Sequence, residues 1–585
     1  MLSPKEWMSR ACEEAFAAEG LDASYGRVNL SNRPDLCEFQ CNGAMAAAKA
    51  AHANPFEIAE KIAARLKENP LFEQVEAVRP GFINLNLSAA AAADYVNELS
   101  VDPGASVEKT GQGKTAVLDY GGANVAKPLH VGHLRSAIIG EALKRLYRFM
   151  GYQAIGDVHL GDWGLQMGLI IEAVREAQPS LPYFDEGFKG DYPSEPPFTI
   201  SDLEEIYPAA SARAKTDENF SERAHAATLR LQQGDPGYTA LFKHVLDVSK
   251  RDLKKNYDAL DVHFELWKGE SDVQHYIAGM LADFEKQGIL KESEGARVIE
   301  VARPDDAKEI PPCLVQKSDG AYLYATTDLA TLIERESLYH PDEIFYITDK
   351  RQSMHFEQVF RAARLSGIVP PEHALRHLGF GTMNGKDGKP FKTRDGGVLR
   401  LEYLLKEVRD AVYERMAETD LPEDEKRQTA AMIGLAALKY GDLSNQATKD
   451  YVFDVERFSS FEGNTGPYIL YTVVRIRSIL RKCRENGVTP GSILPAAAAA
   501  EKTLQLTLCR MGEVLTESFA EKAPHKLCQY LYELSNAFNA FYRDNHILSE
   551  PDAARQRGWI GLLELTEKVL VLFLDLLGIK APERM

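Results

Sequence analysis

The spacing of hydrophobic residues changes along the first part of the chain. Apolar residues recur at helical spacing over residues 55–69, whereas residues 81–87 alternate apolar and polar side chains with period two. The first pattern predicts an amphipathic helix, and the second predicts a half-buried strand. We therefore expect a small α+β module over residues 1–110, which ends in the Pro/Gly/Ser-containing linker 101–106.

The pattern that follows is typical of a parallel sheet. A strand pattern at 116–120 runs into Gly121-Gly122, then into a helix with an apolar stripe over 134–146, and then into a second strand pattern at 153–159. A strand–turn–helix–strand unit of this kind builds a parallel sheet with helices packed on it. We expect a Rossmann-like domain over residues 111–400.

The rest of the chain is richer in helical patterns. Residues from about 183 to 264 are helical and charged, which predicts an insertion between the two halves of the sheet domain. Strand patterns resume at 296–301, 313–316 and 343–348. Residues 401–585 predict an all-helical bundle. Its helical patterns cover residues 430–440, 468–484, 502–516, 526–543 and 559–577. The expected fold class is an α/β protein with a Rossmann-like parallel sheet, an N-terminal α+β module and a C-terminal all-α bundle.

Composition excludes several classes of protein. With 585 residues, 45% of them hydrophobic and 26% charged, the chain has the composition of an ordinary globular protein of several domains. The longest apolar run, Val569 to Ile579, contains Asp575 and is too short to span a bilayer, so we expect no membrane partner. The N-terminus has no apolar core before a small-residue cleavage site, which predicts a cytoplasmic location.

The seven cysteines include no Cys-x-x-Cys pair. Their scatter argues against a disulfide framework and against a structural zinc site. Cys37 and Cys41 are four residues apart, but no second pair of cysteines or histidines nearby completes a tetrahedral set. We interpret both as reduced packing residues, and we expect neither zinc nor another protein-bound metal.

The net charge of −18 argues against unspecific nucleic-acid binding, so any contact with RNA has to be local. One candidate is the stretch 475–484, where five basic residues fall within ten positions. They are Arg475, Arg477, Arg481, Lys482 and Arg484. A solvated helix face gives the same pattern, and the sequence leaves both interpretations open.

The candidate chemistry begins where the first strand of the sheet domain turns into its helix. A helix in this position offers free backbone amides and the positive end of its dipole to an anion. His130 and His133 lie three residues apart in the first turn, and Gly132 lets a nucleotide approach the backbone closely. Histidine donors there can stabilise the charge that develops on an α-phosphate and a leaving pyrophosphate. The turn therefore predicts a nucleotide site, to which Lys127 adds a positive charge.

Longer stretches around this turn resemble one family of proteins. A His-x-Gly-His turn in the first half of a Rossmann-like fold is the first signature of the class I aminoacyl-tRNA synthetases, and the stretch 123–140 resembles the arginyl-tRNA synthetase family. Further stretches that agree are 161–166, 324–328 and 464–468. The resemblance covers nearly the whole chain.

The resemblance implies a two-step reaction. L-arginine is activated with ATP to arginyl-adenylate and pyrophosphate, and the arginyl group is then transferred to the 3′ end of tRNA(Arg), which releases AMP. ATP is expected to enter as its Mg²⁺ complex, and catalysis consists mainly of positioning and charge stabilisation. The resemblance also implies activation that depends on bound tRNA, and we expect a monomer.

The second class I signature is a Lys-Met-Ser-Lys-Ser loop, from which this chain departs. The matching stretch is 388–397. The candidates for contact with the phosphates are Lys389, Lys392, Thr393 and Arg394. The family pattern assigns the work of the missing lysine to Lys127, and a plain solvated loop at 388–397 remains an alternative.

A site for arginine should contain carboxylates, because a planar guanidinium with five donors is best matched by bidentate acceptors. Asp119 ends the first strand of the sheet domain, at the edge where α/β folds place their ligands. The resemblance assigns the arginine pocket to Asp119, Asn124, Tyr324, Asp328, Gln352 and Glu270, with His130 beside them. Tyr324 and Asp328 share a face if they are helical, although a helix-start aspartate beside a packing tyrosine has the same spacing.

The resemblance places tRNA contacts in both terminal regions. Phe82 and Asn84 point to one face of a strand, where a ring and an amide can meet one base of the tRNA elbow, although an ordinary half-buried strand has the same period. Arg475 and Tyr542 lie in the region that resembles the anticodon-binding domain, where aromatic rings can stack on splayed bases. Core packing is the alternative for Tyr542.

Three other functions stay open on the residues alone. A nucleotidyltransferase can use the same His-x-Gly-His turn without RNA, although it has no use for a long helical tail. An inactive synthetase-like RNA scaffold is compatible with the irregular second loop. A class I enzyme specific for lysine is hard to exclude from carboxylates alone.

Overall fold

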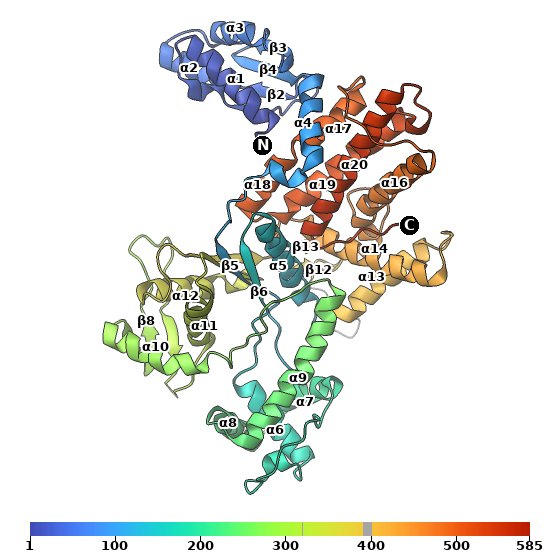
Figure 1. The fold of residues 1–585 in the computed structure, drawn as a ribbon. Helices are drawn as coiled ribbons and strands as arrows, with labels where there is room; N and C mark the ends of the chain where they lie inside the picture. The colour runs from blue at the N-terminus through green and yellow to red at the C-terminus, as the bar shows by residue number, and fades with distance from the viewer. Residues whose placement is uncertain (319, 390–399) are drawn as a thin grey trace.

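The computed structural model of the chain describes residues 1–318, 320–389 and 400–585. The parallel sheet lies at the centre of Figure 1, with the N-terminal module at the top left and the C-terminal helices at the upper right. A helical insertion extends below the sheet, and a mixed helix-and-strand lobe extends to its left. The sheet is therefore the part from which both lobes extend.

The N-terminal module is an antiparallel sheet with helices and a hydrophobic core of its own. The strands pair in the order β1–β2–β4–β3. They are β1 (Val28–Leu30), β2 (Phe39–Cys41), β3 (Phe72–Val78) and β4 (Phe82–Leu87). The helices are α1 (Pro4–Ala18), α2 (Gly43–Ala51) and α3 (Pro55–Leu66), and α4 (Ala89–Val101) leads out of the module. The patterns at 55–69 and 81–87 thus form the predicted helix and strand. Cys37 and Cys41 are buried here, and every cysteine of the chain is a buried free thiol.

The central sheet is parallel, with the strand order β11–β10–β5–β6. The strands are β5 (Thr115–Asp119), β6 (Gln153–Asp157), β10 (Glu343–Asp349) and β11 (Ala374–Phe380). The chain winds in one direction from β5 to β6 and in the other from β10 to β11, so the topological switch lies between β5 and β10. Open α/β sheets bind ligands at such a switch, beyond the carboxyl ends of the strands.

Helix α5 (Val131–Phe149) connects β5 to β6 and is buried along most of its length. Its Ser136 hydroxyl accepts a hydrogen bond from Gly121 N (2.8 Å) and donates one to Ile347 O (2.7 Å), which ties the helix to the turn after β5 and to β10. On its other side α5 contacts the C-terminal helices, and apolar residues of the sheet, of α5 and of those helices form one continuous core. The predicted sheet domain and the predicted C-terminal bundle therefore both pack against α5.

The two lobes differ from the sequence interpretation in detail. The insertion consists of α6 (Leu165–Ala177), α7 (Ile200–Arg213), α8 (Glu218–Gln232) and α9 (Pro236–Ala259). Because α6 packs against α7 and α8, helical structure of this lobe begins before residue 183. The second lobe contains α10 (Gln274–Gln287), β7 (Leu290–Ser293), β8 (Ala296–Ile299), β9 (Cys313–Gln316), α11 (Tyr324–Tyr339) and α12 (Ser353–Leu365). The strand patterns at 296–301 and 313–316 form a separate antiparallel sheet with β7. The sequence did not separate this sheet from the parallel one, because short strands of both kinds have the same period.

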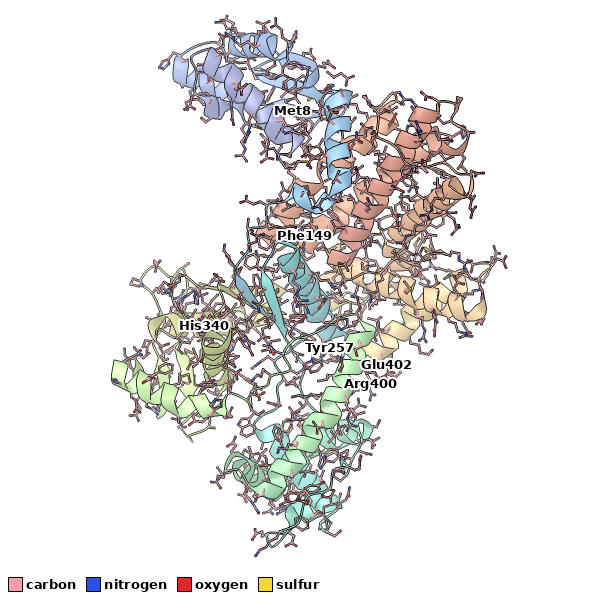
Figure 2. All side chains as sticks on the ribbon, in the orientation of Figure 1. Met8, Phe149, Tyr257, His340, Arg400 and Glu402 are labelled. Atoms are coloured by element: carbon pink, nitrogen blue, oxygen red, sulfur yellow. The ribbon has the colours of Figure 1, made fainter. Side chains whose placement is uncertain are left out.

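The C-terminal region is helical, as predicted. Its main helices are α13 (Leu401–Arg415), α14 (Glu423–Leu443), α16 (Gly466–Glu485), α17 (Ala499–Cys509), α18 (Met511–Glu521), α19 (Pro524–Asp544) and α20 (Ala553–Leu576). The single helix predicted over 502–516 is wrong, because the chain breaks at Arg510 between α17 and α18. Figure 2 shows Arg400 and Glu402 at the start of α13 beside Tyr257 of α9, and Lys255 lies 3.8 Å from Glu402.

Within the described ranges, every helix is too short or too polar to cross a membrane.

Replacing Gly140 of α5 by alanine should destabilise the protein. The new Cβ would lie 2.1 Å from the buried ring of Tyr120, and overpacking of this kind costs about 1–3 kcal/mol. The expected result is a lower thermal unfolding midpoint. Gly279→Ala is the matched control, because Gly279 is helical and its Cβ would meet nothing within 4 Å. There alanine should leave the midpoint unchanged or raise it slightly. Equal midpoints for the two variants would contradict the packing of α5 on Tyr120.

Candidate active site and tRNA-binding surface

The His-x-Gly-His turn forms the start of α5, and its two imidazoles cap the helix. The Nδ1 of His130 accepts a hydrogen bond from Gly132 N (3.0 Å), and the Nδ1 of His133 accepts one from His130 N (3.1 Å). The ring centroids are 3.9 Å apart. Because a neutral imidazole accepts through one nitrogen and donates through the other, each ring carries its proton on Nε2. The turn therefore presents two imidazole N–H donors, while the backbone N–H groups of His130 and Gly132 are already used by the two rings.

Both imidazoles are held in the neutral form. Burial and the nearby Lys127 lower the pKa of His130. Burial and the neighbouring His130 lower the pKa of His133 to about 3. Gly132 is required for this arrangement, because a Cβ there would lie 2.7 Å from Cε1 and 2.9 Å from Nδ1 of His130. The pair can thus donate hydrogen bonds to phosphate oxygens without being charged.

Lys127 lies next to this turn and is positioned by the helical insertion. Its ammonium stands 4.8 Å from the centroid of the Tyr207 ring of α7. Ala126 adopts a left-handed conformation (φ 57°), and its N–H donates to the Ser249 hydroxyl of α9 at 2.9 Å. The insertion therefore holds the backbone that precedes the histidine turn, a role that its charged pattern did not reveal.

Asp119 lies at the carboxyl end of β5, as predicted, but it is paired with an arginine of the protein itself. Asp119 and Asp157 are directly opposite each other in the register of β5 and β6. The Nη2 of Arg335 on α11 donates to Asp119 at 2.6 Å and to Asp157 at 2.8 Å. Arg335 is only 1% exposed, and burial raises the pKa of Asp119 although Arg335 opposes the shift. The carboxylate of Asp119 is therefore already paired with the guanidinium of Arg335.

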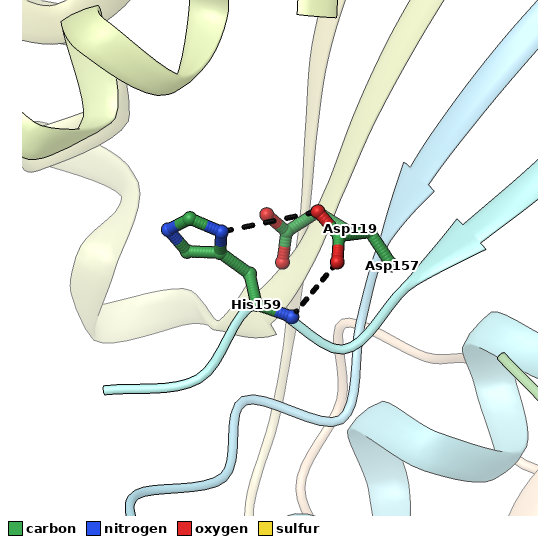
Figure 3. A group of neighbouring side chains, drawn as sticks. All are labelled: Asp119, Asp157 and His159. Atoms are coloured by element: carbon green, nitrogen blue, oxygen red, sulfur yellow. Dashed lines mark hydrogen bonds and ion pairs between the residues drawn. The ribbon is translucent and has the colours of Figure 1, made fainter. Parts of the chain in front are cut away.

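His159 completes this cluster (Figure 3). The backbone N–H of His159 donates to one carboxylate oxygen of Asp157 at 3.2 Å, and the ring Nδ1 of His159 lies 3.8 Å from the other. Potential metal-ligand atoms of Asp119, Asp157 and His159 lie within 4.8 Å of one another. Because Arg335 already occupies both carboxylates, the arrangement is an ion-pair cluster, and a cation would have to displace the guanidinium. Asp157 ends a strand as Asp119 does, so its position in the sequence could have identified it.

Glu270 reaches the same edge of the sheet from the segment that follows the insertion. Its N–H donates to Leu160 O at 3.1 Å, and Asp162 holds the next residue by accepting hydrogen bonds from Ser271 N (2.8 Å) and Ser271 Oγ (2.7 Å). A Cβ on Gly269 would lie 2.4 Å from Asp162, so glycine is required there. Burial, with Asp162 and Asp328 nearby and His159 opposing, raises the pKa of Glu270 to about 7.

Tyr324 and Asp328 lie in the first turns of α11, one helical turn apart as predicted. Desolvation of the phenol and the nearby Glu270 raise the pKa of Tyr324, to which Tyr207 also contributes. Asp328 in turn acts on Glu270, and its carboxylate is 2.5 Å from Nε2 of His355 on α12. Glu270, Tyr324 and Asp328 are thus linked electrostatically, and Tyr207, which also acts on Tyr324, lies next to Lys127.

Two further predicted pocket residues line the same region of the sheet. Asn124 follows β5, and its backbone pairs with Gly161, where a Cβ would lie 2.3 Å from the amide oxygen of Asn124. Gln352 ends a short 3-10 helix, Lys350–Gln352, directly after β10, and its side chain is exposed. Both therefore lie on the connections that leave the two strands at the topological switch.

The predicted phosphate loop is described only at its borders. Lys389 is exposed, and its N–H donates to Asp387 at 3.1 Å. Lys392, Thr393 and Arg394 lie outside the described residues. Arg400 is the first described residue after these, and its backbone pairs with that of His130. The segment after the loop thus returns to the histidine turn.

Arg475 and Tyr542 come together on the C-terminal helices. The guanidinium of Arg475 on α16 lies 4.6 Å from the Tyr471 ring and 5.7 Å from the Tyr542 ring of α19. It also donates to the Asn539 amide oxygen at 2.8 Å and to the Tyr471 hydroxyl at 3.1 Å. Both tyrosines are exposed, 42% and 40%. Tyr471 lies four residues before Arg475, which places both on one face of α16. The sequence offered Tyr471 either as a stacking ring or as a core residue, and its exposure argues against core packing.

Arg477 of the same basic run does not share that face. Arg477 donates to Glu567 at 2.7 Å and to Glu583 at 3.0 Å, and so fixes α16 to α20 and to the C-terminal residues. The run therefore divides between a structural ion pair and an exposed basic and aromatic cluster.

The predicted elbow-binding pair lies on β4. Phe82 is half-buried, whereas Asn84 is 8% exposed and accepts a hydrogen bond from the Gln40 amide of β2 at 2.9 Å. The residue opposite Asn84 on β3 is Glu76, which is exposed. Phe82 and Asn84 thus belong to a sheet face that carries polar side chains, and part of the hydrogen-bonding capacity of Asn84 is already used.

Comparison with known proteins agrees with the geometry of the site. A Rossmann-like parallel sheet whose first helix starts with His-x-Gly-His is the arrangement of the class I aminoacyl-tRNA synthetases, and the family models assign the chain to that class. The family model "tRNA synthetases class I (R), catalytic domain" matches residues 96–455, "DALR anticodon binding domain" matches 469–585, and "Arginyl tRNA synthetase N terminal domain" matches 5–87. The chain belongs to the arginyl-tRNA synthetase family, the class I arginine–tRNA ligases.

Relatives match over their full length. The arginine–tRNA ligase of Agathobacter rectalis is 56% identical over 99% of both chains, and that of Alkaliphilus oremlandii is 51% identical over 99% of both. Among solved structures, the Thermus thermophilus arginyl-tRNA synthetase superimposes with a TM-score of 0.76 at 23% identity, covering 100% of both chains. At that identity the likeness shows the fold.

Replacing Gly132 by alanine should impair activation while leaving the fold intact. The added Cβ would push the His130 ring off its backbone amide, and loss of one positioned donor costs about 10²–10³ in kcat. We expect the kcat of arginine-dependent ATP–pyrophosphate exchange to fall by about that factor, with a circular dichroism spectrum like that of the unmodified protein. Gly279→Ala serves as the control. A kcat within twofold of the unmodified protein would overturn the role of the ring.

Proposed function

We propose that this member of the family joins L-arginine to the 3′ end of tRNA(Arg) in the cleft beyond the carboxyl ends of β5 and β10. The arginine carboxylate attacks the α-phosphorus of ATP, the bond to the β,γ-pyrophosphate breaks, and arginyl-adenylate forms. A ribose hydroxyl of the terminal nucleotide then attacks the activated carbonyl, loses its proton, and displaces AMP. The observation that carries this assignment is the capped histidine turn at the start of α5, with Lys127 beside it. The electrostatic influence of Asp328 on Glu270, and of Glu270 on Tyr324, supports the arginine side.

We assign the ATP side of the cleft to the histidine turn. The Nε2–H groups of His130 and His133 donate to phosphate oxygens, because both Nδ1 atoms already accept from the backbone. The positive end of the α5 dipole adds to them. Lys127 supplies the positive charge. The Mg²⁺ enters with ATP as part of the substrate, and we propose that the protein itself holds no metal. Among Lys389, Lys392, Thr393 and Arg394, the residue that contacts the phosphates stays an open part of the proposal.

We assign the arginine side to the two carboxylates that the protein does not neutralise with an arginine of its own. Glu270 and Asp328 accept from the substrate guanidinium, and Tyr324 closes over it. Asn124 and Gln352 hold the amino acid end, near the phosphates. Asp119 contributes indirectly, because its partner Arg335 fixes α11 and therefore Asp328.

The two terminal regions take the tRNA. We propose that residues 1–110 hold the elbow through Phe82 and Asn84 and that the helices within 401–585 read the anticodon through Arg475 and Tyr542. Exposed rings on both sides of an arginine suit stacking on unpaired bases. We further propose a monomer in the cytoplasm, which gel filtration and cell fractionation can check.

One exchange experiment separates this proposal from its rivals. Radiolabelled pyrophosphate should enter ATP when arginine is present, and more strongly when tRNA(Arg) is added. Absence of exchange even with tRNA(Arg) would favour an inactive RNA scaffold, and exchange without tRNA on another carboxylic acid would favour a nucleotidyltransferase. Charging of total tRNA with lysine instead of arginine would move the assignment to a lysyl enzyme.

The KM for arginine should depend on pH through Glu270. Its pKa of about 7 in the free protein means that the carboxylate is mostly ionised at pH 8 and mostly protonated at pH 6. A protonated carboxyl cannot pair with a guanidinium, so the KM should rise about tenfold as the pH falls from 8 to 6. Glu270→Gln should raise the KM at pH 8 and remove this dependence. Glu336→Gln is the control, because burial also raises the pKa of Glu336, while its partner is His373. A pH-independent KM in the unmodified protein would contradict the assignment.

Arg475→Ala should weaken tRNA binding without affecting the small substrates. Loss of the cation and of the support that it gives the tyrosines should raise the Kd for tRNA(Arg) about 5- to 30-fold. The KM values for ATP and arginine should stay unchanged. Arg477→Ala is the control on the same helix, because Arg477 faces α20; it should lower the thermal midpoint and leave the Kd within twofold. Equal Kd changes for both variants would indicate a general loss of structure.

A further inference from the structure

We propose that Arg135 is a positioning residue for the activation step, through which the C-terminal helices and the edge of the sheet fix the histidine turn. This inference rests on the proposed function of His130 and His133. Arg135 lies two residues after His133 on α5, is 1% exposed, and does not reach the substrates from its buried position. It acts through the turn that precedes it.

Three separate segments meet on the Arg135 guanidinium. Its Nε donates to the carboxylate of Asp442 on α14 at 2.9 Å. Its Nη1 donates to the carbonyl oxygens of Gly381 (2.7 Å) and Lys449 (3.1 Å). Gly381 follows β11 directly, and Lys449 follows α14. One side chain therefore joins the start of α5, the edge of the parallel sheet and the first long helix pair of the C-terminal region.

The segments that meet there are also bound to each other. Strand β12 (Met383–Asn384) pairs with β13 (Tyr451–Val452), and Gly381 N donates to Ala447 O at 2.9 Å. A Cβ on Gly381 would lie 2.5 Å from Asp450 and from Lys449, so only glycine permits this approach. Asp450 accepts hydrogen bonds from Thr382 N (2.8 Å) and from Lys350 (2.7 Å), and Lys350 precedes Gln352 by two residues. The network thus extends from the histidine turn to the Gln352 turn.

Asp442 is the anion of this network and is completely buried. It accepts one hydrogen bond from Arg135 and a second from the Tyr451 hydroxyl at 2.7 Å. The Tyr451 ring also lies 5.0 Å from the Arg135 guanidinium. A buried ion pair contributes little net stability compared with apolar residues of the same volume, but it fixes geometry. Arg135, the cation of this pair, lies two residues after His133, which we propose faces the phosphates. The geometry that the pair fixes is therefore that of the histidine turn.

Arg135→Lys keeps the charge and removes the planar donors, so one ammonium cannot serve the same three acceptors. A misplacement of about 1 Å at a reacting centre can cost about 100-fold in rate. We expect the kcat of arginine- and tRNA-dependent ATP–pyrophosphate exchange to fall about 10- to 100-fold per active site. The KM for arginine and the Kd for tRNA(Arg) should stay within twofold, because none of the direct partners of Arg135, which are Asp442, Gly381 and Lys449, is assigned to either ligand.

A second, milder variant keeps the test valid if Arg135→Lys does not fold. Tyr451→Phe removes one hydrogen bond from Asp442 and should lower the same kcat about two- to tenfold. Arg361→Lys is the matched control: Arg361 is buried on α12, donates to Val301 O (3.0 Å) and binds Asp306 (2.7 Å) far from the turn. It should lower the thermal midpoint and leave the kcat within twofold.

The outcomes separate the inference from the proposed function. A lower midpoint with an unchanged kcat per active site for both Arg135→Lys and Tyr451→Phe would show a purely structural role and overturn the inference. Parallel loss in Arg361→Lys would do the same. Lack of exchange in the unmodified protein with tRNA(Arg) would instead overturn the proposed function, before any variant is compared.

Discussion

The packing of α5 between the parallel sheet and the C-terminal helices is the constraint on which the site depends. The helix is buried on both sides, so its first turn cannot shift without moving the core that it shares with both regions. Ion pairs hold its two ends: Arg135 binds Asp442, and Arg145 binds Asp575 at 3.0 Å. The apolar contacts supply the stability, and the buried Arg135 pair selects one position of the helix. The position of the histidine turn is therefore fixed by the packing of the sheet domain against the C-terminal helices.

A second constraint is electrostatic. Asp119 and Asp157 stand side by side in register, and two adjacent carboxylates at the end of a buried sheet would repel each other without a cation. Arg335 supplies that cation from α11 and thereby orients the helix that carries Tyr324 and Asp328. In the proposed function, the substrate guanidinium therefore meets these two acids already neutralised, and we assign the selection of arginine to Glu270 and Asp328.

Local patterns predicted most of the elements and part of the site. The histidine turn, the strand that ends in Asp119 and the helical face shared by Tyr324 and Asp328 were all predicted, because each depends on residues close in sequence. The partners of those residues were not. Arg335 lies 216 positions from Asp119, and Asp442 lies 307 positions from Arg135, so no periodicity links them. The antiparallel sheet of β7, β8 and β9 was missed because short strands have the same period in parallel and antiparallel sheets. The break at Arg510 was missed because two neighbouring helices show the same period as one longer helix.

The tautomers of the histidine turn have a consequence for how products leave. Since both Nδ1 atoms accept from the backbone, the two Nε2–H donors are neutral and fixed in direction, and in our proposal they face the phosphates. A pair of imidazolium ions would attract pyrophosphate, which is more highly charged than the group it comes from, and would hold it after the bond has broken. Neutral dipoles favour the spread charge of the reacting centre and bind the separated product less tightly. In the proposed function, the capping of this helix therefore bears on how fast pyrophosphate leaves before the tRNA terminus enters.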